Sequence, residues 1–183
     1  MSNTAKNIEV ATLGGGCFWC TEAVFDEVLG VTDVVSGYTA GQRPNPTYEQ
    51  ICGGDTGHAE VVRVTFDPTV ISYATILGIF FATHDPTTLN RQGADRGTQY
   101  RSAIFVHSPE QREIAEKLIA SLNADNTFGA RVVTEVSDAP TFYAAEDYHQ
   151  EFFKRNPNQG YCMAVVSPKV AKFRKLFADR MKK

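Results

Sequence analysis

The sequence lacks a long hydrophobic run, since no stretch of its 183 residues approaches the length needed to cross a bilayer. Its first residues also lack the apolar core and small-residue cleavage site of a secretory signal. Basic residues are not in excess: 18 Lys and Arg stand against 21 Asp and Glu, a net charge of −3. This balance disfavours a surface for nucleic-acid phosphates. These absences predict a cytoplasmic protein that binds neither membranes nor nucleic acid, and we expect a monomer.

Cysteine is also scarce, with four residues at Cys17, Cys20, Cys52 and Cys162. Only one C-x-x-C pair is present, and neither a second such pair nor an H-x-x-x-H pair accompanies it, so half of a structural zinc site is missing. Permanent disulfides are disfavoured in a reducing compartment. We therefore expect no metal, and the cysteines are predicted to be catalytic, redox-active or buried and inert.

The order of apolar patterns predicts an α/β sandwich. Strand-like alternation before residue 14, at 31–38, at 59–66 and at 101–106 is interleaved with helical patterns after residue 17 and at 71–83. Strand, helix, strand, strand, helix, strand is the split βαβ order of ferredoxin-like folds, with helices on one face of a mixed sheet. A helix over 109–122 and a strand over 131–136 are expected to extend this core.

We predict a single catalytic domain over residues 1–183, because no linker or repeat divides the chain and 43% of the residues are hydrophobic. Its core spans about 8–136. An irregular, aromatic-rich segment over about 138–166 is expected to cover the active site, since long ordered loops are usually functional. A helix over about 168–181 completes the domain.

The most informative motif is Gly14-Gly15-Gly16-Cys17-Phe18-Trp19-Cys20. The glycines allow a tight turn, so Cys17 is expected at the N-terminus of a helix, where the helix dipole favours a nucleophilic thiolate. Phe18 and Trp19, the only tryptophan, suggest an apolar pocket in the same turn. A buried inert cysteine and a thioredoxin-like dithiol with Cys20 remain alternative readings.

Glu60 is predicted to lie near Cys17. In a ferredoxin-like sheet the chain leaves the first strand at the end where it enters the third, and Glu60 opens that third strand. A carboxyl group desolvated there has a raised pKa and can act as a general acid. The alternative is an ordinary ion pair with Arg63 or Arg101.

Tyr48 and Tyr100, on loops that flank the expected strands, could donate hydrogen bonds to a developing oxyanion. A cysteine hydrolase would need a partner histidine. Four histidines are present, but none has a spacing that singles it out.

The chain closely resembles the A-type peptide methionine sulfoxide reductases from about residue 8 to about residue 165. The matching motifs are Gly16–Trp19, Gly37–Tyr38, Asn45–Tyr48, Gly54–Glu60, His84–Pro86, Gln92–Gly93, Asp95, Gly97–Ser102 and Ala145–Gln150.

The resemblance implies reduction of methionine S-sulfoxide, free or within proteins, to methionine, by an enzyme type that acts on one sulfoxide epimer. By matching positions, Cys17 attacks the sulfoxide sulfur, while Phe18 and Trp19 form the pocket for the S-methyl group. Glu60 protonates the sulfoxide oxygen.

By the same resemblance, Tyr48 and Tyr100 hydrogen-bond to that oxygen and Asp95 lines the site. No metal or organic cofactor is implied.

The resemblance also implies that a second thiol condenses with the Cys17 sulfenic acid to form a disulfide, which thioredoxin reduces. Cys162 matches the resolving thiol of many members and is expected to swing in on a loop-like segment. Cys20, where many members have glycine, is the second candidate, and a relay through both stays open. Cys52 has a family counterpart usually not assigned to the cycle. A general dithiol oxidoreductase and a non-enzymatic sulfoxide-binding module are the alternatives from other classes.

Overall fold

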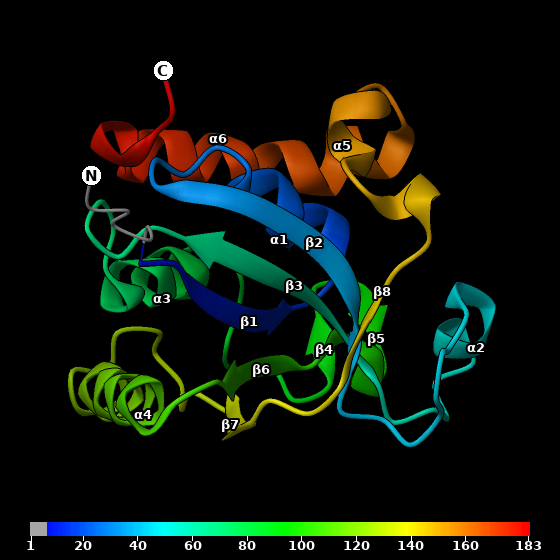
Figure 1. Ribbon diagram of the computed structural model, residues 1–183, viewed down its shortest axis with the longest axis horizontal. Coiled ribbons are helices and arrows are strands. Elements are labelled where there is room, and N and C mark those ends of the chain that lie inside the picture. The colour runs from blue at the N-terminus through cyan, green and yellow to red at the C-terminus, as the bar shows by residue number, and fades with distance from the viewer. Residues whose placement is uncertain (1–6) are drawn as a thin grey trace, which may run out of the picture.

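A computed structural model describes residues 7–183 and contains a twisted six-stranded sheet at its centre (Figure 1). The strand order is β7-β6-β1-β3-β2-β8. The strands are β1 (Glu9–Gly15), β2 (Val31–Thr39), β3 (Ala59–Phe66), β6 (Ser102–Val106), β7 (Glu135–Asp138) and β8 (Phe142–Ala144). Neighbours within β6-β1-β3-β2 are all antiparallel, which confirms the predicted split βαβ order.

Two helices cover one face of this sheet. They are α1 (Phe18–Phe25), between β1 and β2, and α3 (Tyr73–Ala82), which follows β3. Helix α4 (Pro109–Ala124) packs on α3 and along β6 and β7, whereas α6 (Ser167–Leu176) lies against α1 on the opposite side of the molecule (Figure 1).

Shorter elements complete the description. They are α2 (Tyr48–Cys52), β4 (Arg91–Gln92), β5 (Asp95–Arg96), α5 (Phe152–Arg155), the 3-10 turns Thr98–Tyr100, Asp147–His149 and Ala178–Arg180, and the π-helical turn Cys162–Val166.

Strand alternation explains where β3 places its side chains. Val62, Val64 and Phe66 belong to the main core with the helices. Val61 instead belongs to a small cluster with Phe105 on the other face. Because side chains alternate along a strand, Glu60 shares the helix-covered face and lies at its entrance.

The turn before α1 requires glycine at position 16. Gly16 has φ +94°, and a Cβ atom there would lie 2.6 Å from Cγ of Gln92. The left-handed backbone and the close approach both exclude a side chain. Ser108 caps α4 ahead of Pro109, which sets the start of the helix that the sequence predicts over 109–122.

Three sequence-based boundaries differ from the structure. The segment expected to be irregular over about 138–166 contains β8, which pairs with β2 and extends the sheet. The helix expected over about 168–181 ends at Leu176, because the chain turns to bond back to the α1–β2 connection, where Lys182 N donates to Glu27 O. The strand expected over 131–136 begins at Glu135, since Val132 N is bonded instead to Asn123 Oδ1.

One assignment of a polar face is also wrong. Helical spacing from residue 18 groups Glu22 with Asp26 and Glu27 as a polar face of α1, but Glu22 is only 1% exposed. The C-terminal segment, which the periodicity of α1 cannot reveal, covers that side.

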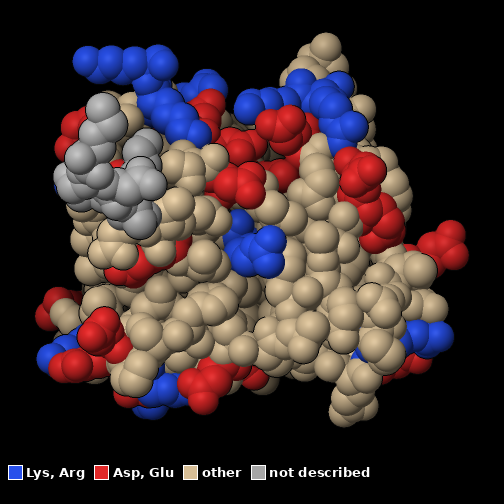
Figure 2. Space-filling view, viewed as in Figure 1, with Lys and Arg blue, Asp and Glu red and all other residues tan. Residues whose placement is uncertain are grey.

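On the face shown in Figure 2, acidic and basic side chains are interspersed, with no extended patch of one sign. Within residues 7–183 no helix combines the length and the apolar character of a membrane span.

We predict that α6 unfolds together with the sheet. Phe173 on α6 is fully buried in the main core, so Phe173→Ala should lower the free energy of unfolding by about 3–5 kcal/mol. The adjacent exposed Lys172→Ala is the matched control and should change it by less than about 0.5 kcal/mol. Urea denaturation monitored by circular dichroism gives both values. Equal losses for the two variants would show that α6 is not part of the cooperative core.

Candidate active site

Cys17 occupies the N-cap of α1, directly after the Gly16 turn, as the sequence predicts. Its residue surface is 9% exposed. The Cys20 amide donates to the Cys17 carbonyl at 3.1 Å, which closes the first turn of the helix and brings both thiols to one side. The two thiols lie close enough to shift each other's pKa.

The expected lowering of the Cys17 pKa is wrong for the reduced, unliganded protein. Burial raises the pKa of the Cys17 thiol well above its usual value, and its hydrogen bond to Cys20 and the nearby Glu60 carboxyl add to the effect. The pKa of Cys20 is lowered instead, chiefly because its sulfur accepts that hydrogen bond, with Lys169 and Tyr161 assisting. Cys20 is therefore the first of the two thiols to lose its proton, and the negative charge lies on its sulfur.

Glu60 lies at the mouth of β3, within reach of the Cys17 turn. Its Oε1 accepts a hydrogen bond from the Phe18 amide at 3.2 Å, which confirms the predicted proximity. Burial raises the pKa of Glu60 to about 8, opposed by that amide and reinforced by Asp95. The carboxyl group is therefore predominantly protonated at neutral pH.

The alternative reading of Glu60 as an ion-pair partner is wrong. Arg101 pairs with Glu135 at 3.7 Å, and the Arg63 guanidinium lies over the ring of Phe142.

Tyr48 and Tyr100 both face Glu60 from short helical segments. Burial raises the pKa of each phenol, with further contributions from the Glu60 charge, so both remain hydrogen-bond donors. Cys52, which lies one turn further along α2, adds to the rise in the Tyr48 pKa. The structure thus brings together the carboxyl and the two phenols that the sequence places on separate loops.

Asp95 is held by Tyr161, whose hydroxyl donates to Asp95 Oδ2 at 2.5 Å. The same hydroxyl also helps to lower the pKa of Cys20. Tyr161 therefore links the dithiol to the acidic residue predicted to line the site.

Aromatic rings surround Trp19. Phe152 stacks on the indole with centroids 3.7 Å apart and an interplanar angle of 5°, and Tyr161 meets it edge-on at 5.8 Å. The indole Nε1 donates to His149 Nδ1 at 3.0 Å. Phe18, only 1% exposed, lies behind this wall against the His149 ring. Trp19, which is only partly buried, forms the part of the wall that reaches solvent.

Glu146 anchors the C-terminal segment to the site. Its two carboxylate oxygens accept from the Tyr38 hydroxyl at 3.0 Å, the Tyr48 amide at 3.1 Å and the Tyr148 hydroxyl at 3.1 Å. These bonds hold the amide of Tyr48 and lower the pKa of Glu146 against the effect of its partial burial.

Sequence reasoning assigned no role to four residues that build this site: Glu146, His149, Phe152 and Tyr161. The first two stand in the Ala145–Gln150 motif, which contributes to the family resemblance but to which no chemical role was assigned. The other two are single aromatics in an aromatic-rich segment, and no spacing distinguishes them.

Cys162 differs from its expected setting. It is fully buried and begins a π-helical turn that runs directly into α6, so its loop-like character is not confirmed. Its pKa is raised by burial and by the charge of Cys20. Cys52 is exposed. All four cysteines are reduced.

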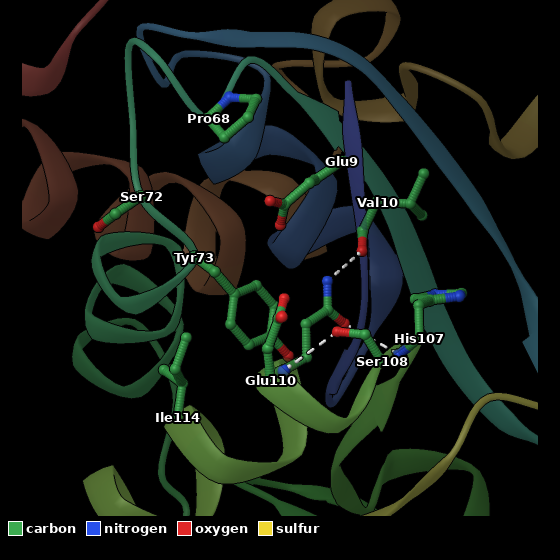
Figure 3. A pocket seen from close by; sticks show the side chains of 10 residues that line it. Glu9, Val10, Pro68, Ser72, Tyr73, His107, Ser108, Glu110 and Ile114 are labelled. Atoms are coloured by element: carbon green, nitrogen blue, oxygen red, sulfur yellow. Dashed lines mark hydrogen bonds between the residues drawn. The ribbon is translucent and has the colours of Figure 1, made fainter. Parts of the chain in front are cut away.

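A cavity of about 580 Å³ lies away from the cysteines, between β1, α3 and the start of α4 (Figure 3). Several of its polar groups are already used by the fold, because Gln111 bonds to both the His107 amide and the Val10 carbonyl. We place the active site at the Cys17 turn instead, where a nucleophile, a neutral acid and two phenols converge.

Comparison with known proteins agrees with this geometry. The family model for peptide methionine sulfoxide reductase matches residues 9–181. Peptide methionine sulfoxide reductase MsrA of Ralstonia nicotianae is 62% identical over 178 residues, covering 95% of this chain and 93% of the relative. MsrA of Deinococcus radiodurans is 59% identical over 174 residues, covering 95% and 84%.

The solved structures support the same assignment. The reduced form of Mxr1 from Saccharomyces cerevisiae has a TM-score of 0.79 and 36% identity, covering 91% of this chain and 94% of that one. Methionine sulfoxide reductase A of Corynebacterium diphtheriae has a TM-score of 0.76 and 37% identity, covering 88% and 80%. The chain therefore belongs to the peptide methionine sulfoxide reductase family, whose members are oxidoreductases that reduce methionine sulfoxide.

Proposed function

We propose that this protein reduces the S epimer of methionine sulfoxide, free or in proteins, through a sulfenic acid on Cys17 and then an intramolecular disulfide. The observation that carries the proposal is the buried Glu60 carboxyl, with a pKa raised to about 8, bonded to the amide of the residue that follows Cys17. A sulfoxide sulfur becomes a good electrophile only when its oxygen is protonated or strongly hydrogen-bonded. An acid kept neutral beside a nucleophilic sulfur provides that pairing.

In the first step, the Cys17 sulfur attacks the sulfoxide sulfur while Glu60 gives its proton to the sulfoxide oxygen. The proton of Cys17 passes to the neighbouring Cys20 sulfur. The attack joins the two sulfur atoms. The hydroxyl then moves from the substrate sulfur to the Cys17 sulfur as the S–O bond and the new S–S bond both break, so methionine leaves and Cys17 carries the hydroxyl as a sulfenic acid. Cys17 is oxidised by two electrons, the sulfoxide is reduced by two, and solvent restores the proton of Glu60.

Tyr48 and Tyr100 supply further hydrogen bonds to the oxygen as charge develops on it. Their raised pKa values keep both hydroxyls protonated through the reaction. Phe18 and Trp19 provide apolar surface for the S-methyl group, and Asp95, fixed by Tyr161, lines the same opening.

Cys20 is the thiol placed to resolve the sulfenic acid. Its thiol already lies close to Cys17, so it displaces the hydroxyl with little movement; a Cys17–Cys20 disulfide forms and water leaves with the Cys20 proton. Cys162 is buried beside Cys20 and can exchange into that disulfide next. The contacts thus favour Cys20 ahead of Cys162, the reverse of the order suggested by family resemblance.

An external dithiol must then return the enzyme to its reduced form. We propose thioredoxin, the reductant that the family resemblance implies. A complex with Trx2 is among the solved structures of Mxr1.

The first prediction concerns stoichiometry. Reduced protein mixed with excess racemic methionine sulfoxide, without added reductant, should release one methionine per chain in a first phase, drawn from the S epimer, because formation of the Cys17–Cys20 disulfide consumes one dithiol. A slower second phase is expected only if Cys162 exchanges into that disulfide and frees Cys17. Chiral chromatography of the sulfoxide and amino-acid analysis measure both quantities. If no methionine forms and the four thiols stay intact, a dithiol oxidoreductase or a sulfoxide-binding module replaces this proposal.

The second prediction concerns the acid. Glu60→Gln should slow the methionine-forming step by roughly 100- to 10,000-fold, because the amide cannot donate an acidic proton. In the wild type this step should lose rate as the pH rises through about 8, where Glu60 ionises. Single-turnover quench-flow between pH 6 and 9 measures the profile. The control is Glu135→Gln, an acidic residue outside the site. An unchanged rate in Glu60→Gln would refute the acid role.

The third prediction separates the two resolving thiols. Cys20→Ser should still release one methionine per chain but accumulate a sulfenic acid, whereas Cys162→Ser should form the Cys17–Cys20 disulfide at the wild-type rate. Dimedone trapping and peptide mass spectrometry distinguish these products. Cys52→Ser serves as the control, since that thiol is exposed. A Cys17–Cys162 disulfide formed at the wild-type rate in Cys20→Ser would reverse the proposed order.

A further inference from the structure

A buried carboxyl group on α1, that of Glu22, has no part in the reaction described above. It is 1% exposed and lies one helical turn after Trp19. Residues three apart on a helix are neighbours on its surface. An ionisable side chain in this position calls for partners that offset its desolvation.

Those partners are backbone amides of the C-terminal segment. Glu22 Oε1 accepts from the Glu151 amide at 2.9 Å, and the Phe152 amide lies close enough to lower the pKa of the carboxyl group. Glu151 precedes α5 with a left-handed φ of 53°, and its own side chain does not cap that helix. Glu22 therefore caps α5 from a distance of 129 residues along the chain.

The first residue of α5 is the one that contacts the tryptophan. Phe152 follows Glu151 directly, and its ring stacks on the indole of Trp19 at 3.7 Å. The same carboxyl group thus holds the backbone of the residue that forms one face of the aromatic wall. A shift of α5 would move Phe152 away from Trp19 without touching either thiol.

We propose that Glu22 is a positioning residue for substrate binding, which holds α5 so that Phe152 keeps the Trp19 indole in its sulfoxide-binding orientation. This inference rests on the proposed function of Trp19 as a wall of the methyl pocket. Glu22 itself touches no reacting atom.

The charges around Glu22 give the interaction a pH signature. The pKa of Glu22 is raised to about 7, chiefly by burial and also by the nearby carboxylates of Asp26 and Glu151, while the Glu151 and Phe152 amides oppose the rise. Lys154 of α5 faces the carboxyl group, and Arg174 of α6 lines the same cavity but is paired with Glu27. Above about pH 7 the charged carboxylate accepts the Glu151 amide hydrogen bond strongly and attracts the neighbouring Phe152 amide. Below that pH the neutral acid interacts with both amides more weakly.

The single tryptophan makes the predicted change directly observable. Fluorescence of the unliganded wild type should show a transition with a midpoint near pH 7, from the coupling of Glu22 to the Trp19–Phe152 stack. Glu22→Gln should lose this transition while retaining those of Glu60, His149 and the thiols. Asp26→Asn is the matched control, because it removes a carboxylate from the same cluster and should keep a transition near neutral pH. A Glu22→Gln protein that retains the wild-type transition would overturn the proposal.

Steady-state kinetics test the path through Phe152. Glu22→Leu should raise KM for methionine sulfoxide roughly tenfold, the cost of one lost charged hydrogen bond, with kcat changed less than about twofold. Phe152→Leu should have the same effect, and the double variant should be no worse than either single one. Additive effects would mean that Glu22 does not act through Phe152. Should Glu22→Leu fail to fold, the comparison is made with Glu22→Gln at pH 8.

These outcomes are separable from the fate of the proposed function. The fluorescence titration requires no sulfoxide and would stand even if the protein released no methionine. Conversely, normal single-turnover chemistry together with a wild-type titration in Glu22→Gln would remove only the positioning role.

Discussion

The burial of the Glu60 carboxyl at the entrance of β3 is the constraint on which the site depends. Keeping it there requires the first turn of α1 to donate the Phe18 amide, and that turn exists only because Gly16 adopts a left-handed conformation against Gln92. The antiparallel register of β1 and β3 brings the two chain segments to the same end of the sheet. Desolvation then raises the pKa of the acid, so the fold itself sets the protonation state that the chemistry needs.

Desolvation also decides the state of the dithiol. The N-terminus of α1 favours an anion, but burial of the Cys17 sulfur and its neighbouring acid outweigh that preference. The charge moves to Cys20, which has Lys169 and Tyr161 as well as the Cys17 thiol to stabilise it. A dithiol arranged in this way keeps the Cys17 thiol protonated at rest and holds Cys20 close to it.

The C-terminal segment builds the second half of the site and is held by buried polar groups. Gln150 bonds to both the amide and the carbonyl of Ser36 on β2. Glu146 joins this segment to Tyr48, and Glu22 joins it to α1. Such bonds are directional, so they specify one placement of the aromatic wall, whereas apolar packing alone tolerates several.

The sequence by itself determined the split βαβ core, the position of Cys17 at a helix start and the approach of Glu60. Strand and helix periods are visible in a short stretch of sequence, and the order of the elements limits the antiparallel topology to few possibilities. Only the tertiary structure decided the raised pKa of Cys17, the burial of Glu22 and the helical setting of Cys162. The Glu22 carboxyl is covered by a segment 129 residues further along the chain. The pKa of Cys17 depends on its burial and on Glu60 of another strand, and the Cys162 turn is helical because it continues into α6. Periodicity indicates which face of an element is apolar, but it does not indicate which distant segment packs over the polar face. The packing of that segment determines how far a polar group is desolvated, and so how far its pKa shifts.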